Sequence, residues 1–214
     1  MDEEVTIIDS NTRNEKIKNF FINNKINLIT TTSVIFILLM GYFFLSEIKE
    51  RNKIKLADRF NLALISFEEG KKQKIVNELI YIVKENETTY SPLALYFLLD
   101  KNLIQSNDEI NNLFDTLINE TNLEKEIKNL IIYKKALFNS NFSTENDLLQ
   151  ILNPIINSES IWRSHALYLL AEYFYSKNEK QKAKEFFEKI LALKDKNIDI
   201  KVKTEKRLNR DFSD

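Results

Sequence analysis

The strongest feature of the hydropathy pattern is an uncharged stretch, residues 26–46, near the start of the chain. Within it, residues 34–45 are apolar on every side of a helix, whereas a core helix of a soluble protein has one polar face. A helix of this length measures about 31 Å, and a bilayer's hydrocarbon core is about 30 Å thick. The stretch therefore predicts one transmembrane helix. Its expected anchor residues are Val34, Ile35, Phe36, Leu38, Leu39, Tyr42, Phe43 and Phe44.

Two other interpretations of this stretch stay open. A cleaved signal peptide has a shorter apolar region, typically about 7–15 residues, and ends at a small-x-small cleavage site. Here the stretch is longer and ends Leu45-Ser46-Glu47. A buried helix of a soluble core is the second alternative, but the stretch has no polar face. We therefore expect an uncleaved signal anchor.

Charge alone does not orient the span, because basic residues lie on both sides of it. Those before it are Arg13, Lys16, Lys18 and Lys25, and those after it are Lys49, Arg51, Lys53 and Lys55. The positive-inside rule is therefore nearly tied. We expect the short N-terminal tail to stay in the cytoplasm while the large downstream domain is translocated.

After the span, apolar residues recur at steps of three and four, the period of amphipathic helices. The first such helix carries Ala57, Phe60, Ala63, Leu64 and Phe67, and Gly70 is expected to end it. Ser91 and Pro92 are expected to begin another, as N-cap and first helical residue. The helix that Ser91 and Pro92 begin is predicted at 93–99, and the remaining helices at 75–83, 110–118, 125–138, 145–156, 162–175 and 180–193.

These helices predict an all-α fold, and the composition agrees. The chain has two glycines and two prolines, where average usage would give about 15 and about 10. Tight β-turns need those residues, so a β-rich fold is disfavoured. The predicted parts are a tail at 1–25, the transmembrane helix at 26–46, a helical linker at 47–56, a repeat domain at 57–195 and a polar capping tail at 196–214.

Helix pairs of this length suggest an internal period of about 34 residues. Counted from Ser164, the last copy places Leu170, Ala171, Phe174, Ala183, Phe187 and Ile190 at positions 7, 8, 11, 20, 24 and 27. This resembles the tetratricopeptide (TPR) pattern, in which small residues let two helices approach and aromatic residues fill the gap to the next pair. Position 32, usually proline, is Asp195.

Weaker copies of this pattern can be placed earlier in the chain. The first uses Phe60, Ala63, Leu64, Phe67, Val76, Ile80 and Val83. The two between use Leu98, Ile110, Phe114 and Leu117, then Ala136, Leu148, Leu152 and Ile155. The prediction is thus a TPR-like α-solenoid of antiparallel helix pairs, with an irregular helical bundle as the alternative.

Both tails allow two interpretations. In residues 1–25, Ile17, Phe20 and Phe21 form the apolar side of a short helix at the membrane interface, unless the tail is disordered. Residues 201–214 are either a solvated capping helix, which a solenoid needs at its end, or a frayed tail, and their five bases against three acids leave open a basic patch that binds a partner.

No catalytic, metal-binding or cofactor-binding pattern stands out. The chain has no cysteine, so disulfides and thiolate sites are excluded, and His165 is its single histidine. We expect His165 to be a packing residue and Trp162 to fill a core gap, with an exposed anchor for a partner peptide as the alternative role of Trp162. The net charge of −1 disfavours nucleic-acid binding. No enzyme activity, cofactor or small-molecule substrate is expected.

The tail ending Lys18-Asn19-Phe20-Phe21, the single span and the Leu170-Ala171-x-x-Phe174 repeat together resemble a bacterial family. It is the inner-membrane family of ancillary Sec-translocon subunits (YfgM-like). The resemblance implies an inner-membrane protein with a cytoplasmic N-terminus and a periplasmic domain. It also implies an adaptor whose partners are the Sec translocon and periplasmic chaperones. An envelope-assembly or division-linked TPR scaffold is the alternative, because it needs only the same anchor and groove.

Overall fold

The structure is a computed structural model that describes residues 2–68, 72–194 and 197–212. The expected stop at Gly70 and the position of Asp195 lie outside these residues. Everything described is α-helix, turn or loop, without a strand, which confirms the all-α prediction for this part of the chain. The helices divide between two compact units, Met1–Lys55 and Leu56–Asp214. Their bounds are α1 Asp2–Asn23, α2 Lys25–Glu68, α3 Lys72–Lys84, α4 Tyr90–Asp100, α5 Asn107–Asn119, α6 Lys125–Asn139, α7 Glu145–Ile156, α8 Arg163–Ser176, α9 Lys180–Ala192 and α10 Ile198–Asp211.

The first unit contains α1 and the greater part of α2. The tail is helical over Asp2–Asn23, and a single turn residue, Asn24, separates it from α2. Residues 26–46 belong to α2, and the linker 47–56 continues in the same helix. The region Lys25–Phe67 contains the one described stretch that is long and apolar enough to cross a membrane, and that apolar stretch is not buried by the protein itself.

Hydroxyl groups in the span bond within the helix. Thr30 Oγ1 donates to the carbonyls of Ile26 (3.0 Å) and Asn27 (2.9 Å), and Thr32 Oγ1 donates to that of Leu28 (2.8 Å). Such back-bonding removes the cost of taking a free hydroxyl into an apolar layer. Thr30 and Thr32 are therefore compatible with an apolar environment.

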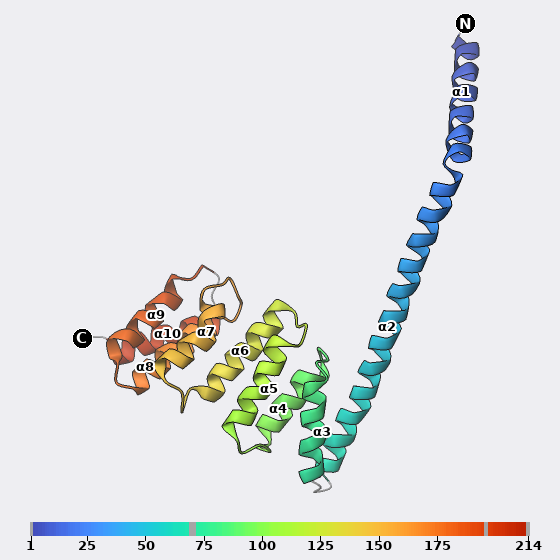
Figure 1. Cartoon of the computed structure of the whole chain (residues 1–214). Helices are drawn as coiled ribbons and strands as arrows, with labels where there is room; N and C mark the ends of the chain where they lie inside the picture. Colours follow the sequence, from blue (N-terminus) through green and yellow to red (C-terminus); the bar gives the residue numbers. More distant parts are fainter. Residues whose placement is uncertain (1, 69–71, 195–196, 213–214) are drawn as a thin grey trace. The chain divides into compact units, whose positions relative to one another are not determined.

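The second unit is a row of helices in chain order, running in Figure 1 from α3 in green to α9 in orange. Each helix packs against the next, and α3 also packs on α5, α6 on α8, and α8 on α10. Two buried apolar clusters fill it. One joins the end of α2 to the start of α6, and the other joins α6 to α10. In this unit each helix therefore packs against helices that are next to it or two places away in the chain.

Asparagine takes the place of glycine where helices end. Asn86, Asn102 and Asn178 have φ angles of 55°, 48° and 63° and follow the ends of α3, α4 and α8. Asparagine tolerates this left-handed conformation better than other residues with a Cβ atom. The residues after Asn102 and Asn178 close the turns with backbone hydrogen bonds. Leu103 N–H donates to Leu98 O, and Glu179 N–H donates to Phe174 O, both at 2.9 Å. The chain therefore makes tight helix ends with few glycines.

The expected N-cap at Ser91 is wrong. Helix α4 begins one residue earlier, at Tyr90, and the N-cap residue is Thr89, whose side chain makes no capping bond. The carboxylate of Glu87 accepts from the backbone N–H groups of Thr89 (2.7 Å) and Tyr90 (2.6 Å) instead. Ser91 is buried, and its hydroxyl donates to Ile82 O at 2.7 Å, near the end of α3. The Ser91 hydroxyl, which the local pattern predicts to cap α4, therefore makes a tertiary contact between α4 and α3 instead.

Candidate interaction surfaces

The six residues predicted to pack the last repeat lie in the α8–α9 hairpin. Leu170, Ala171 and Phe174 come from α8, and Ala183, Phe187 and Ile190 from α9; all are buried in the second cluster. The ring of Phe174 stacks on Phe186 with centroids 5.3 Å apart, and Phe187 meets Tyr168 edge-on at 5.5 Å. These side chains hold the hairpin together and are not accessible to a partner.

Besides polar contacts over shorter separations, such as Asn111 with Asn139 at 28 positions, the second unit has several that join residues 33 to 37 positions apart. Five of them link successive hairpins or their loops: Asn86 to Glu120, Ser160 to Glu126, Lys182 to Glu145, Arg207 to Glu172, and Asn197 N–H to the Ser164 hydroxyl. Their sequence separations are 34, 34, 37, 35 and 33. Equivalent places in consecutive helix pairs therefore meet at a nearly constant spacing along the chain.

Side chains of the even-numbered helices form a continuous chain of contacts, which we call the even-helix row. It links α2 to α4 through Phe67 and Phe97 (5.3 Å), and α4 to α6 through Lys134 Nζ over the Tyr96 ring (4.9 Å). It then links α6 to α8 through Tyr133 and His165 (5.9 Å). The members are Phe67, Tyr96, Phe97, Tyr133, Lys134, Trp162, His165, Tyr168, Glu172 and Arg207. Each of these ten side chains is half-buried.

Burial shapes the chemistry of this row. It raises the pKa values of Tyr96 and Tyr168 to about 12, and it raises that of Tyr133 as well. The Tyr96 hydroxyl is enclosed without a hydrogen-bond partner. Burial, helped by the charge of Lys203, lowers the pKa of His165 below its usual 6.5, so this imidazole is neutral at pH 7. The row thus presents neutral aromatic rings, with charge carried by Lys134, Glu172 and Arg207.

Trp162 is held in place at the start of α8. Its indole N–H donates to the Glu126 carbonyl at 3.1 Å, and its ring stacks on Tyr133 with centroids 6.0 Å apart. The Glu126 carboxylate accepts from the Ser160 hydroxyl (2.7 Å) and the Ile161 N–H (3.2 Å). The tryptophan is half-buried, so it fills an inter-helix gap and leaves part of its ring at the surface.

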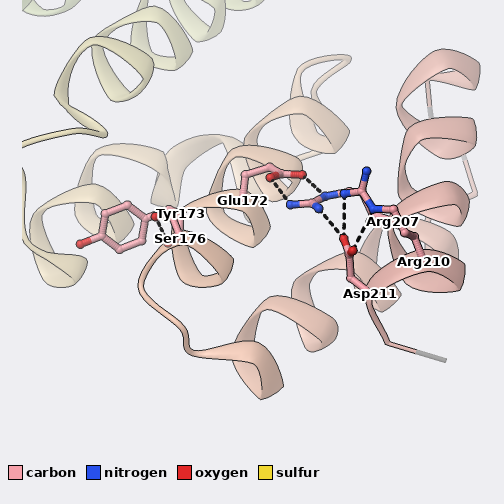
Figure 2. A network of polar contacts seen from close by, with 6 residues as sticks. All are labelled: Glu172, Tyr173, Ser176, Arg207, Arg210 and Asp211. Carbon is pink, nitrogen blue, oxygen red and sulfur yellow. Dashed lines mark hydrogen bonds and ion pairs between the residues drawn. The ribbon is translucent and has the colours of Figure 1, made fainter. Parts of the chain in front are cut away.

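Figure 2 shows a polar network that the sequence pattern did not reveal, between α8 and α10. Arg207 donates to both carboxylate oxygens of Glu172, at 2.7 and 2.6 Å, and also pairs with Asp211. Arg210 donates to Asp211 at 2.8 Å, and this bond is the main cause that lowers the pKa of Asp211. The guanidinium of Arg207 lies 4.3 Å from the centre of the Tyr175 ring.

The network joins α10, the last described helix, to α8. Residues Ile198–Asp211 form α10, which packs on α8 and α9 and buries Ile200 and Thr204. Of the two interpretations of this segment, the helix is observed, and one side of it is buried against α8 and α9. The sequence does contain one indication of this network, because Arg207 and Asp211 are spaced four residues apart on one helix. Nothing near Arg207 in the sequence indicates its other partner, Glu172, which lies 35 positions earlier.

An open hollow of about 910 Å³ lies between the end of α7, the start of α8 and the end of α9. Ile156, Leu167 and Phe186 line it together with Arg163 and Lys189, among others. Among the described residues, no group of three or more histidine, aspartate or glutamate side chains is placed to hold a metal ion.

Comparisons with protein-family models, with curated proteins and with solved structures find nothing that matches this chain.

Proposed function

We propose that this protein is a membrane-anchored adaptor whose helical-repeat domain binds other proteins. One observation carries the proposal: α2 contains both the unburied apolar stretch 26–46 and Leu56, Phe60 and Ala63, which belong to the core of the second unit. A helix with those two properties ties a folded domain to a bilayer. A tethered domain meets membrane partners at a raised effective concentration, so modest affinity suffices.

We further propose that the second unit is a TPR-like solenoid. The contacts at separations of 33 to 37 residues support this, because stacked repeats bring equivalent positions together once per repeat. Small residues at the predicted closest approach, Ala171 and Ala183, support it too, since both are fully buried between α8 and α9. In such a stack one helix of each pair lines the binding face, and the even-helix row is our candidate for that face.

For the partners and location we propose those of the resembled family. The protein would sit in the bacterial inner membrane with its N-terminus in the cytoplasm and its domain in the periplasm. It would bind the Sec translocon and periplasmic chaperones there. Half-buried aromatic rings suit this role, because they offer a large contact area at little entropic cost. Binding, and not catalysis, is the proposed activity.

In-cell photo-crosslinking from the even-helix row tests the proposal. A photoreactive residue replaces Leu137, which is exposed on α6 one turn from Tyr133. The matched control replaces Gln150, which is exposed on α7, an odd-numbered helix. We expect translocon or chaperone crosslinks from position 137 and far fewer from position 150.

Two results would count against the proposal in different ways. Equal crosslinking from both positions would remove the even-helix row as the binding face. Repeated capture of division or envelope-assembly proteins without translocon components would replace the Sec assignment with the scaffold function.

A further inference from the structure

Residues 16–25, just before the apolar stretch, combine cations and large apolar side chains without any acid. The sequence is KIKNFFINNK, with Lys16, Lys18 and Lys25 as its charges. Phe20 and Phe21 are 56% and 58% exposed, and Ile17 and Ile22 are exposed as well. The protein itself covers none of these four side chains fully. We call this segment the basic collar.

The backbone carries the basic collar almost directly into the span. Asn24 N–H donates to Phe20 O at 3.0 Å, and Leu28 N–H donates to Asn24 O at 2.9 Å, so helical bonding bridges the single turn residue. At 1.5 Å per residue, Phe21 then lies about 7.5 Å from Ile26 along the helix, Lys18 about 12 Å and Lys16 about 15 Å.

These distances match the layers of a membrane surface. The headgroup region adds roughly 5–7 Å to each side of the hydrocarbon core, which places the two phenylalanines at its outer edge. Aromatic rings favour that depth. Lys25 lies at the inner edge of the headgroups, and Lys16 and Lys18 lie within about one Debye length, 8 Å, of their surface. Cations at such depths are attracted to anionic lipids.

The other end of the span differs. Residues 47–55 carry four basic residues but also Glu47 and Glu50, and Glu47 accepts from Arg51 at 2.8 Å. No aromatic residue occurs there. Charge complementarity with an anionic surface is thus concentrated in the basic collar.

We propose that the basic collar binds the headgroups of anionic phospholipids in the leaflet that α2 enters. The inference rests on the membrane-anchor part of the proposed function. The three lysines supply the attraction, and Phe20, Phe21 and Ile22 lie at the headgroup layer, so that anionic lipids gather around the segment in this leaflet.

The test uses the full chain reconstituted into vesicles of phosphatidylglycerol and phosphatidylcholine at 3:7. Because the chain has no cysteine, Asn19→Cys provides one site for an environment-sensitive fluorophore. Spin-labelled phosphatidylglycerol or spin-labelled phosphatidylcholine, at equal mole fraction, then quenches the dye. We expect spin-labelled phosphatidylglycerol to quench the dye on the order of 5-fold or more better than spin-labelled phosphatidylcholine. The reason is that each lysine near an anionic surface gains about 1 kcal/mol, which is a factor of about 5 in the equilibrium constant.

Two variants give the comparison. Lys16→Gln, Lys18→Gln and Lys25→Gln together should reduce the preference to about 1. The matched set Lys49→Gln, Lys53→Gln and Lys55→Gln, beyond the other end of the span, should leave it unchanged. High salt should weaken the preference in the parent chain.

The outcomes separate the two proposals. Equal quenching by both lipids in a chain that floats with the vesicles would overturn the basic-collar inference and leave the anchor standing. So would a preference that survives the first variant or is lost in the matched set. A chain that does not float with vesicles at all would overturn the anchor as well.

Discussion

At the scale of single residues, Arg207 is the side chain that joins α10 to α8 by an ion pair. It is only 15% exposed at its side chain and pairs with Glu172 on α8 and Asp211 on its own helix. A fork-shaped guanidinium makes two parallel bonds to one carboxylate, a geometry that lysine cannot copy. The Arg207 side chain therefore does more to fix α10 than the many exposed lysines around it.

We predict that Arg207→Gln lowers the free energy of unfolding of the Leu56–Asp214 unit by roughly 1–3 kcal/mol. Three charge-assisted hydrogen bonds are lost, two to Glu172 and one to Asp211, and the half-buried Glu172 carboxylate is left without its partner. Urea unfolding followed by circular dichroism measures this. Arg210→Gln, at a side chain that is 67% exposed, is the control and should change stability by no more than about 0.5 kcal/mol. Equal effects of the two substitutions would mean that the Glu172 pair contributes nothing.

His165 predicts a pH dependence at the same scale. Its pKa is lowered in the folded domain, chiefly by burial and also by Lys203, so the unfolded chain binds the proton more readily. Stability from this residue is complete above pH 6.5 and declines as the pH falls below 6.5 through the folded pKa. Unfolding curves between pH 7.5 and pH 5 should show the decline, and His165→Gln should remove that part of it. An unchanged slope in the variant would assign the pH dependence to other groups.

At the scale of elements, helix ends are where local and tertiary demands compete. α7 follows the local pattern fully: Thr144 and Asp147 make a reciprocal capping box. α4 does not, because Ser91 turns away from its own helix end and bonds Ile82 O on α3. Ser91 Oγ also accepts from the Glu87 N–H at 2.9 Å, so one hydroxyl satisfies two backbone groups at the α3–α4 junction.

Ser91→Ala should therefore cost roughly 1–3 kcal/mol of stability, because the Glu87 N–H loses the Ser91 acceptor and the Ile82 carbonyl keeps only its longer bond from Glu85 N–H, 3.3 Å. The control is Ser140→Ala. That hydroxyl also donates to a carbonyl, Leu137 O at 2.8 Å, but in an exposed position where water replaces it. We expect the control to stay within about 0.5 kcal/mol of the parent in the same urea experiment. Similar losses for both serines would contradict the role of burial.

At the scale of the whole molecule, the proposed membrane anchor predicts a topology that experiment can measure. The absence of cysteine allows single labelling sites to be introduced on either side of this anchor. Asn14 lies in the exposed part of α1, and Asn146 is exposed on α7. Labelling at these two sites reports on which side of the membrane each unit lies.

We predict that Asn146→Cys reacts with a membrane-impermeant maleimide in intact cells stripped of their outer membrane. Asn14→Cys should react only after the membrane is opened, because a short tail remains inside while the domain is translocated. The reverse pattern would place the domain in the cytoplasm and exclude periplasmic partners. Recovery of the unlabelled chain in the soluble fraction without detergent would contradict the membrane anchor itself.

The sequence by itself determined those features that depend on a single helix and not on how helices pack. The uncharged stretch 26–46 and the helical period after it need only local order, and both are present as helix. The buried alanines Ala171 and Ala183 could be placed for the same reason, because close packing within a hairpin requires small residues at fixed steps.

Only the tertiary structure decided which polar groups meet. The pairing of Arg207 with Glu172, the Trp162 bond to the Glu126 carbonyl, and the hydroxyl of Ser91 on α3 join residues from different helices or loops. Such contacts depend on the angle and register at which helices stack, and those follow from the packing of whole faces. The even-helix row has the same origin, since Lys134 meets Tyr96, and Tyr133 meets His165, only when the helices pack together.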